Sequence, residues 1–254
     1  MKGAIIILIT KGPFITNVIN DDNHKLKLQT KTSQSLKLGF LLAIVGGFLD
    51  AYTFVCRGGV FANAQTGNIV LFGIELTKGN FKQAIMAFLP ILAFIIGTLV
   101  AEKIKDFKSP SAAFVTNSEC LILAIEIIVL FIIGFIPTNI PDIFVTVPIS
   151  FVSSVQISCF RTLVDSPYCT TMCTGNLRSA CHSAYIAFTK KDNKSAENTT
   201  RYAIIIVSFL VGSCIGGIST LWVGVKSIWI SAIILILCLG LFRIDENKAY
   251  RYPN

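Results

Sequence analysis

The stretch Gly58–Gly73 reads GGVFANAQTGNIVLFG and is a polar tract within a very apolar chain. Its tripeptide TGN, at 66–68, returns at 174–176, which is 108 residues later. At this shift the apolar segments before the two tripeptides also align, and after an insertion in the charged run 190–197 Gly97 aligns with Gly212. The sequence therefore predicts two copies of one unit of roughly a hundred residues, a common design of membrane transporters.

The composition indicates an integral membrane protein. Hydrophobic residues make up 53% of the chain, charged residues only 14%, and the mean hydropathy is +0.70, whereas about a quarter of the residues in soluble proteins are charged. The net charge of +8 does not indicate a nucleic-acid partner, because the basic residues lie in the links and tails between apolar runs. The eight cysteines lie mainly inside apolar segments, where free thiols behave as small hydrophobic groups.

We divide the chain into two tails and two membrane repeats. Residues 1–35 are expected to form a cytoplasmic tail, with an amphipathic surface helix as the alternative for its short apolar start. The first repeat covers 36–136, the second covers 141–242, and residues 243–254 form a cytoplasmic tail. Spans of about 20 residues are needed to cross a bilayer. Segments near this length are expected at 36–55, 81–100, 120–136, 144–160, 202–223 and 228–242.

Two shorter elements, 69–76 and 174–188, follow the tripeptides, and charge decides whether they cross the membrane. If they crossed, the basic link 103–108 would face outward, against the rule that positive links stay inside. If they are re-entrant, six spans remain, and both termini and the basic loop 190–201 lie in the cytoplasm. Three crossings per unit make the repeats inverted. We therefore expect an all-α protein of the cytoplasmic membrane with six spans and two half-helices.

The two TGN elements are the predicted solute site. Non-helical backbone is tolerated at membrane depth only where protein or a water-filled cavity satisfies it. Each half-helix is expected to begin at its tripeptide, with Thr and Asn as caps and with unpaired N–H groups that suit a polar or anionic solute. The alternative is that each tripeptide only caps a short packed helix. The predicted substrate-binding residues are Asp50, Asn63, Gln65, Thr66, Gly67, Asn68, Arg161, Thr174, Gly175 and Asn176.

Charged residues within spans are costly and are often functional. Asp50 lies about one turn from the helix break, and Arg161 corresponds to Thr53 in the repeat alignment, so the two are expected in similar surroundings. They either share a solute or pair, unless each extends to an interface. Glu126 is either a proton-titrating group or a neutral group that serves helix packing. Asp50 and Glu126 are thus the candidates for proton coupling.

Enzymatic and metal-binding readings are not supported. The sequence contains no nucleophile elbow, phosphate-binding loop, zinc-protease motif or dinucleotide fingerprint. Cys169, Met172 and Cys173 have a spacing that could hold Cu(I), but we interpret them as packing groups. We therefore expect no catalytic activity, no cofactor and no metal.

The segment Gly46–Ile74, GGFLDAYTFVCRGGVFANAQTGNIVLFGI, resembles the YoaK-like bacterial membrane proteins, an uncharacterised family. Members typically show GG-x-x-DA-x-T/G followed by GGVF-x-x-x-QTGN, and the likeness extends over about 36–242. The resemblance implies a six-span inner-membrane protein and no particular substrate. The break before the half-helix is also similar in architecture to the central elements of sulfate-type and nucleobase-type transporters. The residues that carry the family resemblance are Asp50, Asn63, Gln65, Thr66, Gly67 and Asn68.

Together these inferences predict a protein that moves a small polar or anionic solute across the cytoplasmic membrane. Its expected partners are the lipid bilayer and this solute, and the oligomeric state is left open. A passive channel is the first alternative, because paired re-entrant half-helices also build pores. A membrane scaffold or sensor that transports nothing is the second.

Overall fold

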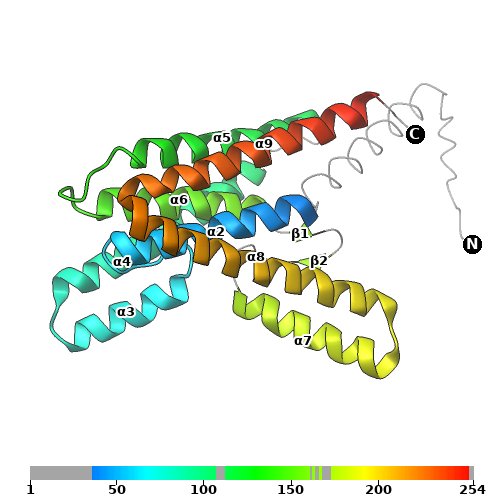
Figure 1. Ribbon diagram of the computed structural model, residues 1–254, viewed down its shortest axis with the longest axis horizontal. Coiled ribbons are helices and arrows are strands. Elements are labelled where there is room, and N and C mark those ends of the chain that lie inside the picture. Colours follow the sequence, from blue (N-terminus) through cyan, green and yellow to red (C-terminus); the bar gives the residue numbers. More distant parts are fainter. Residues whose placement is uncertain (1–35, 107–111, 161, 164–165, 168–172, 252–254) are drawn as a thin grey trace, which may run out of the picture.

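The computed structural model describes residues 36–106, 112–160, 162–163, 166–167 and 173–251 (Figure 1). These residues are helical apart from turns, links and one antiparallel pair of two-residue strands, β1 (Thr162–Leu163) and β2 (Ser166–Pro167). The first half of the chain forms α2 (Leu36–Cys56), α3 (Gln65–Thr77), α4 (Phe81–Asp106) and α5 (Ala112–Ile133). The second half forms α6 (Ile143–Cys159), α7 (Cys173–Lys190), α8 (Asn193–Val223), the short 3₁₀ helix η1 (Gly224–Ser227) and α9 (Ile228–Arg251). The predicted helical class is confirmed.

Three helices extend beyond the predicted spans into charged sequence, and the first of them is α4, which continues to Asp106. α8 begins at Asn193, so the prediction of a loop over 190–201 is wrong for most of that segment. Asp192 explains the early start, because its side chain accepts a hydrogen bond from the backbone N–H of Ser195 at 3.0 Å and so caps the first turn. α9 likewise continues to Arg251, within the predicted tail. An apolar run therefore marks only the membrane-buried part of a helix.

Three helical stretches are long and apolar enough to cross a membrane, judged by length and composition over the described residues. They are Leu36–Cys56, Phe81–Lys105 and Asn193–Ile244, the last of which contains both α8 and α9. α6 is apolar but shorter. α3 has 13 residues, which at 1.5 Å per residue is about 20 Å and less than the hydrocarbon thickness of a bilayer.

Helices of the first half pack mainly against helices of the second half (Figure 1). α2 lies against α8, and α4 lies against α6. α3 lies on α4, and α7 lies on α8. α5 contacts α9, while α2 contacts α9 and α6 contacts α5. Each of these contacts has a counterpart when the helices α2–α5 are exchanged for α6–α9 in order.

Close crossings depend on glycine. A Cβ atom on Gly212 of α8 would overlap the backbone carbonyl of Ile44 in α2. At the crossing of α4 and α6, a Cβ atom on Gly97 would overlap the Ser154 hydroxyl. Small residues allow membrane helices to approach closely, since packing and not hydrophobic burial drives their association. Gly97 and Gly212, which the repeat alignment matches, therefore each allow one of these two close crossings.

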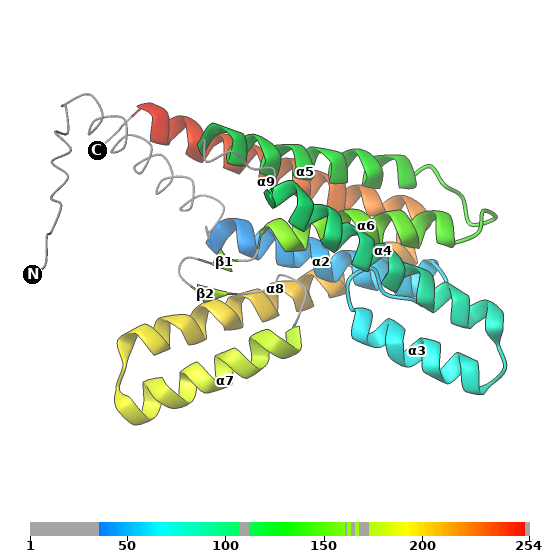
Figure 2. The ribbon, with the colours of Figure 1, turned by 180° about the vertical axis from the view of Figure 1, so that it is seen from behind.

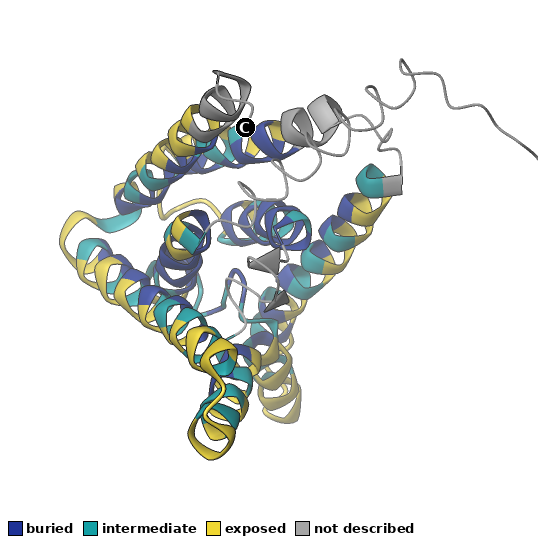
Figure 3. Cartoon of the chain, turned by 90° about the vertical axis from the view of Figure 1, so that its right-hand side faces the viewer, coloured by how far each residue is buried: buried dark blue, intermediate teal, exposed yellow. Residues whose placement is uncertain are grey.

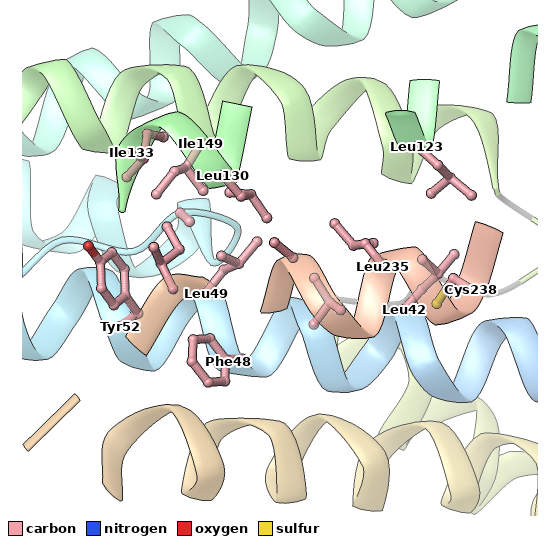
Figure 4. Close-up of a cluster of buried hydrophobic side chains, with 14 of the residues drawn as sticks. Leu42, Phe48, Leu49, Tyr52, Leu123, Leu130, Ile133, Ile149, Leu235 and Cys238 are labelled. Carbon is pink, nitrogen blue, oxygen red and sulfur yellow. The ribbon is translucent and has the colours of Figure 1, made fainter. Parts of the chain in front are cut away.

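The largest apolar cluster lies between α2, α5, α6 and α9 (Figure 4). Leu42 and Leu49 of α2, Leu123 and Leu130 of α5, and Leu235 of α9 are each at most 1% exposed. The outer faces of the helices are exposed instead (Figure 3) and carry large apolar side chains such as Leu99 and Leu221. Apolar side chains on both faces are expected where one face meets protein and the other meets lipid.

Helix ends gather at two opposite ends of the molecule. In Figures 1 and 2, α2 begins, α5 begins and α9 ends at one end of the long axis. The α2–α3 link, the α5–α6 link and η1 lie at the other end. α3 and α7 both begin near the middle of the long axis and run toward opposite ends. This course brings the first turn of each toward the interior of the molecule.

Candidate functional site

Asp50 holds the bend between α2 and α3. Its Oδ1 atom accepts hydrogen bonds from the backbone N–H groups of Asn63 at 2.6 Å and Ala64 at 3.3 Å. The Asp50 residue is only 5% exposed. The Asn63 side chain in turn donates to the carbonyl of Gly46 at 3.2 Å, which ties the bend to α2 a second time. α3 has no side-chain cap of its own, so a carboxylate from another helix supports its start.

Asn68 braces the same bend from the other side. Its side chain accepts from the N–H of Phe61 at 2.8 Å and donates to the Phe61 carbonyl at 2.7 Å. It also donates to Gln65 Oε1 at 2.9 Å, while Gln65 donates to the carbonyl of Ala62 at 2.9 Å. A Cβ atom on Gly67 would come within 2.7 Å of the Phe61 ring. Asn68 and Gly67 therefore serve the folding of the loop.

The predicted capping role of the first tripeptide is wrong. α3 begins at Gln65, and its N-cap is Ala64. Thr66, Gly67 and Asn68 consequently lie within the first turn, and the Thr66 side chain is exposed. The first turn can start earlier than predicted because Asp50 already satisfies the backbone N–H groups just ahead of it. The sequence contains no local sign of a cap donated from 13 residues away.

Several buried polar atoms around this bend have no hydrogen-bond partner among the described residues. Asp50 Oδ2 and Asn63 Oδ1 lie in the bend itself. Ser150 of α6 donates to the carbonyl of Ala62 at 2.9 Å, which brings the polar face of α6 to the loop. Thr146 and Ser153, four residues before and three after Ser150, share that face. The side-chain hydroxyls of Thr146 and Ser153 have no partner among the described residues, and the same holds for the Thr98 hydroxyl of α4 and the Nε2 atom of Gln156, which lie elsewhere on their helices.

The second TGN element occupies a similar place in α7. Thr174 and Gly175 are exposed, whereas Asn176 is buried, as Asn68 is in α3. Asn176 is the fourth residue of α7 and Asn68 is the fourth of α3. α7 begins at Cys173, so here too the tripeptide lies inside the first turn and the predicted cap is misplaced. Arg161 lies outside the described residues, and its predicted proximity to Asp50 stays a prediction.

Glu126 lies apart from the bend, on α5 in the region that packs against α9. The Glu126 residue is 1% exposed. Neither carboxyl oxygen has a hydrogen-bond partner among the described residues. The two acids that we predicted as proton-coupling candidates thus have different surroundings: Asp50 is held by two backbone N–H groups, and Glu126 by none that the structure describes.

Arg57 is a structural centre that the sequence analysis did not single out. Its side chain is fully buried and donates to the Tyr52 hydroxyl at 3.2 Å, to the carbonyl of Pro137 at 3.3 Å and to the carbonyl of Ile136. Its Nη1 atom also lies 3.7 Å from Asp142 Oδ1. The Tyr52 hydroxyl in turn donates to the Val225 carbonyl at 3.1 Å. Arg57 therefore joins α2 to the α5–α6 link directly and to η1 through Tyr52.

The sequence does contain a signal from which the contact between Arg57 and Asp142 could have been predicted. Arg57 and Asp142 each lie at the end of an apolar run, and the predicted six-span topology puts both on the same outer side. A lone arginine and a lone acid on one side of a membrane protein are candidates for an ion pair. Gly58 supports the close approach, because its φ of 82° is unfavourable for a side chain and a Cβ atom there would lie 3.3 Å from Asp142 Oδ2.

No group of three or more His, Cys, Asp or Glu side chains that could hold a metal occurs within the described residues. Cys169 and Met172 lie outside them. The described polar cluster at the bend offers carboxylate, amide and hydroxyl groups but no nucleophile paired with a base. Its chemistry is that of hydrogen-bonded recognition.

Comparison with known proteins agrees with this description. The chain is 29% identical over 186 residues to the "UPF0700 transmembrane protein YoaK" of Bacillus subtilis (strain 168), which corresponds to 69% of this chain and 79% of that protein. No solved structure matches the chain. Together with the apolar helices, this relative identifies a multi-pass membrane protein. Residues 38–241 match the family described as "Protein of unknown function (DUF1275)", and the chain therefore belongs to that family of uncharacterised YoaK-like membrane proteins.

Proposed function

We propose that this protein transports a small polar solute across the cytoplasmic membrane and that the solute passes beside the bend between α2 and α3. The observation that carries the proposal is the set of buried polar atoms at this bend without partners among the described residues. In a membrane interior such groups are costly unless water or a solute satisfies them. A solute pathway supplies that partner.

Six crossings in two inverted repeats are the topology that we propose. α3 and α7 start near the middle of the long axis and leave toward opposite ends, which supports two re-entrant elements (Figure 2). The matched packing of α2 with α8 and of α4 with α6 supports a twofold relation between the halves. With the long axis along the membrane normal, both termini and the basic end of α4 at Lys103 and Lys105 face the cytoplasm.

The chemistry of the bend favours a solute that donates hydrogen bonds. Asp50 Oδ2 and Asn63 Oδ1 are both acceptors, and the hydroxyl groups of Thr146 and Ser153 can donate or accept. A carboxylate repels an anion, so of the two predicted solute classes the polar one fits this half of the site better than the anionic one. Anions are also tested as solutes, because the backbone N–H groups at the start of each half-helix can bind an anion.

The first experiment identifies a solute by thermal stabilisation of the purified protein. A ligand that binds the folded state raises the melting temperature by mass action. The panel contains polyols, amides, amino acids, ammonium, phosphate and sulfate. Compounds that stabilise the protein are then tested for uptake into proteoliposomes with and without an imposed pH gradient. Accumulation driven by the gradient supports a proton-coupled carrier, whereas downhill flux alone supports the channel.

Thr146→Val separates a wet pathway from dry packing. Valine has the shape of threonine without the hydroxyl, so in dry packing the change leaves stability equal or higher. A pathway that uses this hydroxyl loses solute stabilisation and uptake in the same variant. Thr200→Val is the matched control, because Thr200 is exposed and lies on α8, outside the predicted solute site. No stabilisation and no flux across the panel, with Thr146→Val equal to the parent, would support the scaffold alternative.

A further inference from the structure

Glu126 is enclosed by apolar side chains at the α5–α9 interface. It lies three residues after Leu123 and four before Leu130, so the three share one face of α5. Leu123 and Leu130 lie on the side of α5 that faces Leu235 and Cys238 of α9 (Figure 4), and all four are buried in one cluster. An acid on this face is surrounded mainly by leucine side chains, which cannot hydrogen-bond to a carboxylate, and the Cys238 thiol is at most a weak donor.

The titratable groups around Glu126 offer it no positive charge. The helices that pack against α5 are α9 and α6. From α9, the Cys238 thiol is close enough to interact with the charge of Glu126. From α6, the Cys159 thiol at the end of the helix packs against this cluster. Glu119 on α5 and Arg243 on α9 lie toward one end of the interface, and each has an interaction of its own.

We propose that Glu126 is the principal proton-binding site of this protein and that Asp50 takes up a proton less readily. An ionised carboxylate is strongly disfavoured in an apolar interior without a hydrogen-bond donor or a cation, whereas the neutral acid is tolerated. Glu126 has neither among the described residues. Asp50 differs, because two backbone N–H groups donate to its Oδ1 atom, and such bonds stabilise the ionised form. The two acids therefore differ in degree: at Asp50 two donated hydrogen bonds oppose protonation, whereas Glu126 has no such bond among the described residues.

The position of Glu126 gives the proton a structural consequence. α5 and α9 are the last helices of the two halves, and they pack against each other. Loss of the proton places a charge inside this contact, and the charge becomes tolerable only when water enters between the helices. Proton release at Glu126 is thus linked to opening of the joint between the halves. This link goes beyond the proposed transport, because it needs no solute.

Labelling with dicyclohexylcarbodiimide tests the site in the full-length protein in lipid vesicles. This apolar reagent adds to protonated carboxyl groups and forms a stable acylurea, which mass spectrometry locates by peptide. We expect labelling at Glu126 to persist at neutral pH, where an ordinary glutamate with a pKa of about 4.3 is ionised, and to decrease as the pH is raised further. Glu126→Gln should abolish this signal, and the Asp50 peptide should be labelled more weakly than the Glu126 peptide of the parent. The exposed Glu102 acts as an internal control for an ionised acid.

The opposite outcomes are distinct. Labelling at Asp50 with none at Glu126 would overturn the assignment. Equal labelling of Glu126 at all pH values would show a permanently neutral packing group and would also overturn it. As a second measurement, the melting temperature of the parent should fall as the pH is raised from acidic to alkaline values. That fall should be smaller in Glu126→Gln. An unchanged pH dependence in the variant contradicts the proposal even if no solute is ever found.

Discussion

At the scale of single residues, one acid from α2 fixes the backbone of a loop that lies 13 residues further along the chain. Asp50 accepts from the N–H groups of Asn63 and Ala64, and Asn68 closes the loop from the start of α3. Asp50, Asn63 and Asn68 are among the residues that carry the family resemblance. Their side chains form the hydrogen bonds that hold the bend. Asp50 Oδ2 and Asn63 Oδ1 have no partner among the described residues and are the atoms that could bind a solute.

Substitution of Asp50 tests this structural role. We expect Asp50→Ala to lower stability by about 1–3 kcal/mol, because two buried N–H groups lose their acceptor. Asp50→Asn retains an acceptor oxygen, so a smaller loss is expected. Thermal unfolding in detergent or nanodiscs measures both. Thr66→Val, with an exposed side chain, should stay within about 0.5 kcal/mol of the parent; a parent-like melting curve for Asp50→Ala would contradict the bracing role.

Arg57 is the second residue whose loss should be severe. Its guanidinium serves the Tyr52 hydroxyl and the carbonyls of the α5–α6 link at once, so Arg57→Ala is expected to cost on the order of 3 kcal/mol or more. Arg57→Lys should retain only part of the stability that Arg57→Ala loses, because an ammonium group lacks the planar fork of donors of a guanidinium group. Asp142→Asn should cost less, since the Asp142 side chain is 27% exposed. Urea or thermal unfolding ranks the three variants, and an equal ranking would contradict this account.

At the scale of helices, backbone approach at glycine sets the crossings. Gly212→Ala is expected to destabilise the α2–α8 contact by about 1–3 kcal/mol, because the new methyl group overlaps the Ile44 carbonyl. Gly217→Ala is a matched control in the same helix: no atom lies within 4 Å of its added Cβ. Alanine there should be neutral or stabilising by up to about 1 kcal/mol through helix propensity. Relative to the parent, the melting temperature should therefore fall in Gly212→Ala and stay equal or rise in Gly217→Ala.

The start of α8 should respond to pH through Asp192. The Ser195 hydroxyl and then its backbone N–H donate to this carboxylate and hold the pKa of Asp192 below its usual range. The capping contribution is therefore complete above the ordinary carboxyl pKa and is lost as pH falls through the lowered one. Hydrogen exchange over 193–199 should accelerate, relative to its intrinsic rate, at acidic pH. Asp192→Ala should exchange fast at every pH; protection that survives in this variant would rule out the cap.

At the scale of the whole molecule, the proposed inverted topology makes a direct accessibility prediction. With six crossings, Asn80 and Thr138 face outward and Lys191 faces the cytoplasm. In intact cells, an impermeant thiol reagent should label Asn80→Cys and Thr138→Cys but not Lys191→Cys, each in a background without the native cysteines. If all eight long elements crossed, Asn80 and Thr138 would face inward instead. Labelling of Lys191→Cys after permeabilisation is the control for reactivity.

Membrane class, the approximate helix positions and the break after α2 could be predicted because they depend on local composition. A run of about twenty apolar residues reports burial in lipid wherever it occurs. The break after α2 is visible because Gly58 and Gly59 interrupt such a run, and both adopt positive φ angles of 82° and 69°. Helix ends were less predictable, since the cap at Asp192 and charged residues beyond the membrane extend α8 and α9.

Contacts between distant segments required the folded chain. Asp50 supports the start of α3 only because the bend folds back along α2. Arg57 reaches the carbonyls of the α5–α6 link only because this link lies beside the end of α2 in the folded protein. The isolation of Glu126 likewise follows from what α9 places opposite it. Composition acts on each segment separately, whereas hydrogen bonds and burial depend on which segments become neighbours, and only tertiary packing decides that.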